Sequence, residues 1–108
     1  MSRKKIIELT TPGEILKEEF LEALGLKEIE VAKALDIPAS RLSEIIHGKR
    51  AISLDTAMRL SIYFTTTPLF WLNLQNNYDL QKIQEESPKC FGAVRPLRRR
   101  RRALVPLK

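Results

Sequence analysis

The chain has little cysteine, histidine and glycine, and these shortages exclude several classes of protein. It contains one Cys, one His and four Gly among 108 residues. A single thiol cannot form an internal disulfide, and one His with one Cys offers too few ligands for a zinc-type site. Neither a glycine-rich phosphate loop nor a nucleophile elbow occurs. We therefore predict a protein that is not an enzyme and that holds no cofactor and no metal.

Long hydrophobic runs are also missing. No apolar segment approaches the roughly 20 residues that a membrane-spanning helix needs, and the N-terminus lacks the hydrophobic stretch of a signal peptide. The sequence thus predicts a cytoplasmic protein with no membrane partner and no small-molecule ligand. With 108 residues, 44% of them hydrophobic, the chain can form one domain with a modest core. Small domains of this kind are often stabilised by dimerisation.

Positive charge is concentrated at the C-terminus. The chain carries 19 Lys and Arg against 13 Asp and Glu, which gives a net charge of +6. Seven of the cations and none of the acids lie in residues 95–108, so residues 1–94 hold 12 cations and 13 acids, a net charge of −1. Residues 87–108 also contain three of the six prolines and a run of five arginines. We predict a disordered basic tail over residues 87–108.

Cap and turn residues divide the rest of the chain into helices. Thr11 and Pro12 form a start signal, a capping residue followed by proline at the first helical position. Inside this first helix, Leu16, Phe20 and Leu24 recur at a spacing that brings them to one inward face. The same reasoning predicts helices over about residues 12–24, 28–35, 39–47, 54–64 and 68–86, within a domain at 11–86 that follows an N-terminal arm at 1–10. Gly25 and Gly48 are predicted to end the first and third of these helices, and Ser53 to cap the fourth.

Residues 27–50 have the pattern of a helix-turn-helix. Two apolar stripes at helical spacing lie on either side of an Asp-Ile-Pro break at residues 36–38. The stripes consist of Val31, Ala32 and Leu35 before the break and Leu42, Ile45 and Ile46 after it. The small side chain of Ala32 lets the two helices cross closely, so that the second helix can protrude into a groove. The sequence therefore predicts binding to double-stranded DNA.

The outward side of the second helix supplies the candidate base-reading residues. In the major groove Arg pairs with guanine, Ser bonds several bases and Ala meets a thymine methyl, which makes Ser40 and Arg41 the strongest candidates. The full set that remains outward is Ala39, Ser40, Arg41, Ser43 and Glu44. Cations near the helix ends are better placed to reach phosphate than bases. These are Lys27, Lys49 and Arg50.

The last predicted helix indicates a partner copy. Between Pro68 and Tyr78 apolar residues point to all sides, and such a helix needs burial on more than one side. A homodimer would supply the second covering surface and would match the two-fold symmetry of most helix-turn-helix operators. The candidate dimerisation residues are Phe70, Trp71, Leu74 and Tyr78. The pattern leaves open whether Trp71 lies in the core of one chain or in the dimer seam.

Several sequence blocks closely resemble the HigA (VapI-type) antitoxins, which are helix-turn-helix proteins of the xenobiotic-response-element type. The blocks keep their order and spacing over about residues 10–83. They include Thr11-Pro12-Gly13-Glu14-Ile15-Leu16, Gly48-Lys49-Arg50-Ala51-Ile52-Ser53 and Pro68-Leu69-Phe70-Trp71-Leu72-Asn73-Leu74-Gln75. The resemblance implies an all-α fold, a five-helix lambda-repressor-like helix-turn-helix domain with an apolar C-terminal dimerisation helix.

The resemblance also implies a function. It indicates a bacterial homodimeric repressor that binds a palindromic operator at its own promoter and neutralises a HigB-like toxin that cleaves messenger RNA. A stand-alone phage- or plasmid-type repressor without a toxin is the alternative, and a pure interaction protein is a third hypothesis. For the toxin, the acidic side chains Glu14, Glu18 and Glu22 of the first helix would complement a basic ribonuclease.

Three positions depart from the family pattern. Asp36 stands in the turn where glycine is usual, and Lys27 and Pro38 stand where Ser or Thr caps are expected. Asp tolerates left-handed backbone geometry better than most residues, so the turn can still form. Each missing cap is expected to cost about 1 kcal/mol.

Overall fold

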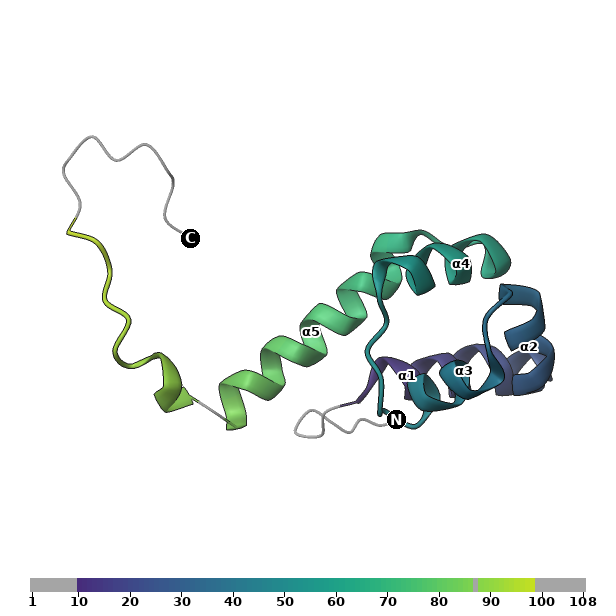
Figure 1. The fold of residues 1–108 in the computed structure, drawn as a ribbon, viewed down its shortest axis with the longest axis horizontal. Helices are drawn as coiled ribbons and strands as arrows, with labels where there is room; N and C mark the ends of the chain where they lie inside the picture. Colours follow the sequence, from purple (N-terminus) through teal and green to yellow (C-terminus); the bar gives the residue numbers. More distant parts are fainter. Residues whose placement is uncertain (1–9, 87, 99–108) are drawn as a thin grey trace.

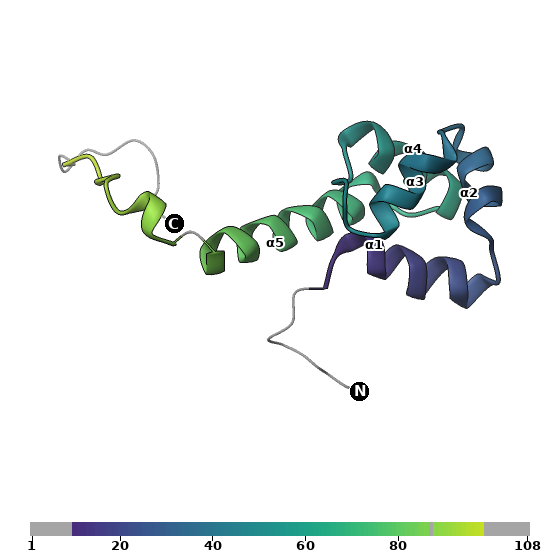
Figure 2. The ribbon, with the colours of Figure 1, turned by 60° about the horizontal axis from the view of Figure 1, so that its bottom comes forward.

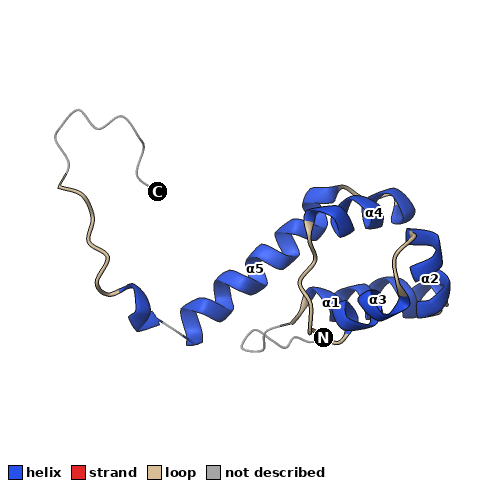
Figure 3. Ribbon diagram, viewed as in Figure 1, coloured by secondary structure: helices blue, strands red, loops and turns tan. Residues whose placement is uncertain are grey.

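The structure is a computed structural model that describes residues 10–86 and 88–98. All regular structure within these residues is helical (Figures 1 and 3). The elements in chain order are α1 (Pro12–Ile15), which continues into the π-helical η1 (Leu16–Glu22), then α2 (Glu28–Leu35), α3 (Ala39–Ile46), α4 (Leu54–Phe64), α5 (Pro68–Glu86) and the 3-10 helix η2 (Pro88–Phe91). The prediction of an all-α fold with five α-helices is confirmed.

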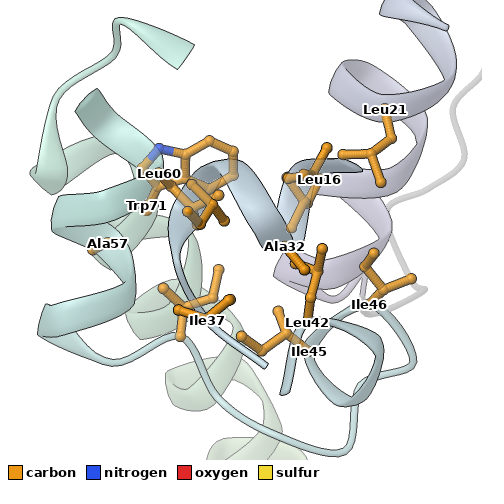
Figure 4. Packing of buried hydrophobic residues seen from close by; sticks show 13 residues of the cluster. Leu16, Leu21, Ala32, Ile37, Leu42, Ile45, Ile46, Ala57, Leu60 and Trp71 are labelled. Carbon is orange, nitrogen blue, oxygen red and sulfur yellow. The ribbon is translucent and has the colours of Figure 1, made fainter. Parts of the chain in front are cut away.

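The core lies where the first four α-helices, η1 and the start of α5 meet. Trp71 is the largest fully buried side chain, and Leu16, Leu42 and Leu60 from three other helices are likewise 0% exposed. Figure 4 shows side chains from η1, α2, α3, α4 and α5 converging on one cluster. Burial of each large apolar side chain contributes roughly 1.5–3 kcal/mol, so this cluster accounts for most of the packing that holds the helices together.

A close backbone contact joins α1 to α3. A Cβ atom built on Gly13 would lie 1.9 Å from the carbonyl oxygen of Ile45 and 2.9 Å from Cα of Ile46. Only a residue without a side chain fits at this distance. In the sequence, the block around Gly13 indicates only a helix start. No local pattern shows that Gly13 packs against another helix, because its contact partners, Ile45 and Ile46, are distant in the sequence.

The first helix follows its predicted apolar stripe only in part. Leu16 and Leu21 are 0% and 3% exposed, whereas Leu24 is 60% exposed. The π-helical turns of η1 hold more residues per turn than the 3.6 of an α-helix, which brings Leu21 toward the side of Leu16, whereas Leu24 lies beyond η1 at the end of the helix. Leu21 is therefore buried beside Leu16, and the prediction that Leu24 points inward is wrong.

Four helical segments end in the same left-handed motif. Gly25, Asp36, Gly48 and Thr65 have φ of 68°, 59°, 77° and 58°. After each of them, the next N–H donates to the carbonyl five residues back, over 2.8–3.1 Å. The predicted stops at the two glycines and the predicted tolerance of Asp36 for this geometry are confirmed.

The two halves of α5 differ in burial. Trp71 and Gln75 of the first half are buried, and every residue from 79 to 86 is exposed. In two views the second half extends beyond the other helices (Figures 1 and 2). Trp71 has no exposed surface in the single chain. This answers the question left open by the sequence and removes Trp71 from the predicted dimerisation residues, because its indole is enclosed by its own chain.

The predicted terminal segments fall partly outside the described residues. These are residues 1–9 of the predicted arm and, in the predicted basic tail, residue 87 and residues 99–108, which include four of the five consecutive arginines. Within the described part of the tail, η2 forms one short helical turn and residues 89–98 are exposed. The prediction of disorder for this tail stays a prediction.

Candidate nucleic-acid interface

Helices α2 and α3 form the helix pair predicted for residues 27–50. The inward residues of both helices are at most 4% exposed, namely Val31, Ala32, Leu35, Leu42, Ile45 and Ile46. Ile37 is 8% exposed and fills the core beneath the turn. With these side chains committed to the core, the outward face of α3 is fixed by packing alone.

The turn between α2 and α3 is closed from two sides. The N–H of Ile37 donates to the carbonyl of Ala32 at 3.1 Å. From α4, Nη1 of Arg59 donates to the carbonyls of Leu35 at 2.9 Å and Asp36 at 3.2 Å. These bonds satisfy carbonyl groups that the end of a helix leaves without partners. The helical spacing of α4 places Arg59 on an outward face, and no local pattern reveals a bond to residues 23 and 24 positions away.

The start of α2 is better satisfied than the sequence indicated. The N–H of Lys27 donates to Oε1 of Glu30 at 2.9 Å, which is half of a capping box. This bond satisfies the N–H of Lys27 itself, while no side chain at Lys27 caps the first turn of α2, in agreement with the prediction. At Pro38, which precedes α3, no side chain caps the helix, in agreement with the prediction.

The candidate base-reading residues lie along the outward side of α3 with different surroundings. Ala39 and Ser40 are exposed, and Arg41, Ser43 and Glu44 are half-buried. Nη1 of Arg41 lies 3.7 Å from Oδ2 of Asp55 in α4. Arg41 therefore has an acidic neighbour, while Ser40 at the helix start is open to solvent.

Glu44 and Arg50 form an ion pair. Nε of Arg50 donates to Oε1 of Glu44 at 2.8 Å, and both side chains are about half exposed. Glu44 is a predicted base-reading residue and Arg50 a predicted phosphate contact, and the structure joins the two. The pair lowers the free positive charge of Arg50, so Lys49 is the stronger phosphate candidate at this end of α3.

The three phosphate candidates, Lys27, Lys49 and Arg50, are exposed. Lys49 and Arg50 follow the left-handed Gly48 and line a cavity of about 170 Å³ between the start of α1 and α5. Lys82 and Asp79 of α5 line the same cavity, so three cations and one carboxylate line it. Lys27 stands apart from them at the start of α2.

The remaining predicted dimerisation residues differ in exposure. Phe70 is 39% exposed and packs edge-on against Trp71, with ring centroids 4.9 Å apart. Leu74 is half-buried against the core. Tyr78 is half-buried and lines the cavity beside Lys49. Among these residues, Phe70, with its exposed neighbour Leu69, offers apolar surface to a partner.

The predicted toxin-binding residues lie on the exposed side of α1 and η1. Oε1 of Glu14 accepts from the N–H of Thr11 at 3.2 Å, while Oγ1 of Thr11 accepts from the N–H of Glu14 at 3.1 Å. Glu14 therefore completes a capping box and has a structural role. Glu22 lies 3.7 Å from Nζ of Lys17, and Glu18 is exposed.

The described part of the chain offers neither a metal cluster nor a membrane span. Among residues 10–86 and 88–98, no three His, Cys, Asp or Glu side chains group as a metal site would require. No helix in the same residues is both long enough and apolar enough to cross a membrane.

The buried α2–α3 pair, its closed turn and the outward α3 face define a helix-turn-helix protein. The family model described as Helix-turn-helix (HTH_3) matches residues 17–72. The chain is 44% identical to virulence-associated protein I of Dichelobacter nodosus, covering 80% of this chain and 79% of that protein. It belongs to the HigA (VapI-type) antitoxin family of helix-turn-helix proteins.

Two relatives carry the antitoxin name. The chain is 35% identical to antitoxin HigA-1 of Vibrio cholerae, covering 79% of this chain and 80% of that one. The structure of Pseudomonas aeruginosa antitoxin HigA with the higBA promoter superposes with a TM-score of 0.78 at 36% identity, covering 83% of this chain and 99% of that chain. Membership of this family of DNA-binding regulators and antitoxins agrees with the prediction, made from composition, that the chain is not an enzyme.

Proposed function

We propose that this chain is the antitoxin of a HigB/HigA-type module, a homodimeric repressor that binds a palindromic operator at its own promoter and neutralises a toxin that cleaves messenger RNA. The observation that carries the DNA-binding part is the start of α3, where Ser40 is exposed and Arg41 half-buried on a helix whose other face is buried in the core. The Pseudomonas aeruginosa antitoxin with the same fold is bound to promoter DNA.

Different outward residues bind the bases and the phosphates of the DNA. Ser40 and Arg41 at the start of α3 read base edges in the major groove, with Ala39 and Ser43 beside them. Lys49 and Lys27 bind phosphate and supply affinity without sequence preference. Arg50 contributes less than a free cation because Glu44 holds its Nε at 2.8 Å.

Fluorescence anisotropy tests the DNA-binding part. The chain ending at Glu86, which retains all five α-helices without the arginine run, is titrated onto its own upstream DNA and onto a scrambled duplex at two salt concentrations. We expect a preference of roughly 10³ or more for the upstream DNA, as is typical of specific binders. Equal weak binding to both duplexes contradicts the proposal and favours the interaction-protein hypothesis.

Two variants separate base reading from phosphate binding. Arg41→Ala should lower affinity for the upstream DNA by about 10- to 100-fold and reduce the preference over the scrambled duplex. Lys49→Ala should weaken binding to both duplexes alike and reduce the salt dependence by about one unit of slope. If Arg41→Ala weakens both duplexes equally, Arg41 does not read bases.

A homodimer explains why α5 carries apolar side chains that its own chain leaves uncovered. Leu69 and Phe70 are 63% and 39% exposed, next to the buried Trp71. A second copy covering this surface would bury them and would present two α3 helices to two half-sites. Sedimentation of the full chain should show a dimer whose dissociation constant rises in Leu69→Asp. A monomer at all concentrations contradicts this part of the proposal.

The toxin-neutralising part rests on the family and on the exposed acids of η1. Charge reversal at Glu18 and Glu22, by Glu18→Lys with Glu22→Lys, should weaken binding to a HigB-like toxin more at low salt than at high salt, because exposed charges are screened by salt. Unchanged toxin affinity rejects this surface. Absence of any toxin complex, with operator binding retained, favours the stand-alone repressor.

A further inference from the structure

The carboxylate of Asp55 in α4 lies close to a side chain on the outward face of α3. Oδ2 of Asp55 accepts from Nε of Arg59 at 2.9 Å and lies 3.7 Å from Nη1 of Arg41. Asp55 and Arg59 are separated by one turn of α4, and Arg41 is in α3. The same oxygen atom therefore lies between two guanidinium groups, one of which belongs to the proposed base-reading side chain.

Arg59 holds Asp55 in place. While its Nε bonds Asp55, its Nη1 donates to the carbonyls of Leu35 and Asp36 at the end of α2. The donors of a guanidinium lie in one rigid plane, so these bonds fix its orientation. The carboxylate of Asp55 thereby has a defined position relative to the helix-turn-helix, unlike a free acid on a helix surface.

The contact between Asp55 and Arg41 contributes little energy, but it has a defined position. At 3.7 Å it is longer than a hydrogen bond, and the two side chains are 57% and 36% exposed. Ion pairs of this exposure contribute little to stability. The five donors of Arg41 therefore remain available to a base, while the nearby negative charge restricts the directions in which its long side chain extends.

We propose that Asp55, fixed by Arg59, is a specificity-determining positioning residue for Arg41. Its carboxylate favours side-chain directions of Arg41 that lie beside Asp55 and partly offsets the charge of Arg41, so that this cation gains less from phosphates and is oriented toward base edges. The proposal rests on the proposed DNA-binding function of this chain. It places part of the sequence preference in α4, outside the recognition helix.

The expected consequence follows from the two ways in which Arg binds DNA. A free Arg side chain is attracted to any phosphate, which raises affinity for all sequences. A bidentate contact with guanine needs a defined orientation, and ordering a flexible side chain on binding lowers affinity. Removing the charge of Asp55 should therefore raise the affinity for scrambled DNA. The affinity for the operator should rise by a smaller factor, or it should fall.

A double-mutant cycle on the full chain tests the proposal. The wild type, Asp55→Asn, Arg41→Ala and the combined variant are titrated onto the operator duplex and the scrambled duplex, and the ratio of the two dissociation constants is compared. Asp55→Asn should lower this ratio by about two- to tenfold, within the range of coupling between neighbouring residues. In the Arg41→Ala background, Asp55→Asn should leave the ratio unchanged.

Two control variants separate positioning from a general effect of charge and from altered folding. Glu85→Gln removes one negative charge from the exposed second half of α5, and it should not change the ratio. Arg59→Lys keeps the charge but loses the planar set of donors, so it should lower the ratio as Asp55→Asn does and also lower the thermal midpoint. The thermal midpoint of Asp55→Asn shows whether a changed ratio reflects altered folding.

The outcomes separate this inference from the proposed function. If the wild type prefers its operator and Asp55→Asn changes binding to both duplexes equally, Asp55 acts only through its charge and the positioning role is rejected. The role is also rejected if Asp55→Asn lowers the ratio equally with and without Arg41. If the wild type shows no preference for its operator, the proposed function fails, and this inference fails with it.

Discussion

The helical body of the chain, residues 11–78, and the second half of α5, residues 79–86, are held by different means. In the body, packing and polar bonds act together: Trp71 is fully buried, and its Nε1 donates to Oγ1 of Thr66 at 2.8 Å. Nine residues further along the same helix, Leu80 is 57% exposed. The helix continues because no Gly or Pro interrupts it before Pro88, although the core has ended. The length of α5 thus depends on its local sequence, whereas its burial depends on how far the core extends.

The largest expected effect is at Trp71. Trp71→Ala removes a fully buried indole that packs against Phe20 and Phe70, with ring centroids 4.9 Å away in each case. Truncation of a buried aromatic side chain to Ala lowers the free energy of unfolding by about 3–5 kcal/mol. Urea unfolding followed by circular dichroism measures this loss.

The matched variant in the second half of α5 is Leu80→Ala. Because Leu80 is exposed and Ala favours helix, the free energy of unfolding should change by no more than about 0.5 kcal/mol. A loss at Leu80 comparable to that at Trp71 would show that the second half of α5 is packed after all, and the comparison would fail.

The next effect concerns the close contact between α1 and α3. Gly13→Ala should lower the free energy of unfolding by about 1–3 kcal/mol, because the new Cβ would lie 1.9 Å from the backbone oxygen of Ile45. The change opposes helix propensity, which favours Ala over Gly by about 1 kcal/mol. Gly92→Ala is the control, since its Cβ would meet the nearest atom, the oxygen of Lys89, at an ordinary 3.5 Å. Stabilisation by Gly13→Ala would refute the close packing.

A smaller effect, of opposite sign, is expected where α4 ends. Thr65 has a left-handed backbone with φ of 58°, which costs a residue with a branched side chain about 1–2 kcal/mol. Because Asn adopts this geometry more readily, Thr65→Asn should raise the free energy of unfolding by up to about 1 kcal/mol. The helical body would then be more stable relative to the second half of α5. Thr67→Asn serves as a control without this gain: Oγ1 of Thr67 accepts from the N–H of Phe70, and Asn caps equally well. If Thr65→Asn and Thr67→Asn shift the thermal midpoint equally, the backbone of Thr65 is not strained.

The smallest effect on folding is expected at Ile83, which is 44% exposed in the second half of α5. Ile83→Ser should change the free energy of unfolding of the single chain by less than about 0.5 kcal/mol. Unfolding is measured at the lowest usable protein concentration, and sedimentation is measured in parallel. A weakened dimer with unchanged unfolding would extend the proposed partner contact along α5, whereas an unchanged dimer confines it to the surface around Phe70.

Local sequence signals predicted much of the fold. The starts at Thr11 and Ser53, the left-handed ends at Gly25 and Gly48 and the inward stripes of α2 and α3 depend on neighbours within a turn or two. A helical wheel at 3.6 residues per turn does not anticipate the π-helical turns that bury Leu21, and it does not show that Leu24 lies beyond η1, where the side chain is exposed.

The candidate site was predicted less completely than the fold. Periodicity identified the outward residues of α3 but could not pair Glu44 with Arg50 or Arg41 with Asp55. These partners are 6 and 14 positions apart, and their approach depends on how the loop after Gly48 returns the chain to α4. Gln75 helps to fix that loop, since its Oε1 accepts from the N–H of Ile52 at 2.8 Å, a bond that spans 23 residues.

The sequence by itself determined the helices, their ends, the inward face of the helix-turn-helix and the family of the chain, because caps, glycines and apolar spacing act over a few residues. Only the tertiary structure decided that Trp71 belongs to the core of one chain, that Gly13 lies against Ile45 and that Arg59 closes the turn and holds Asp55. Those contacts join residues that are distant in the sequence. Their formation depends on the packing of whole helices, which no local pattern encodes.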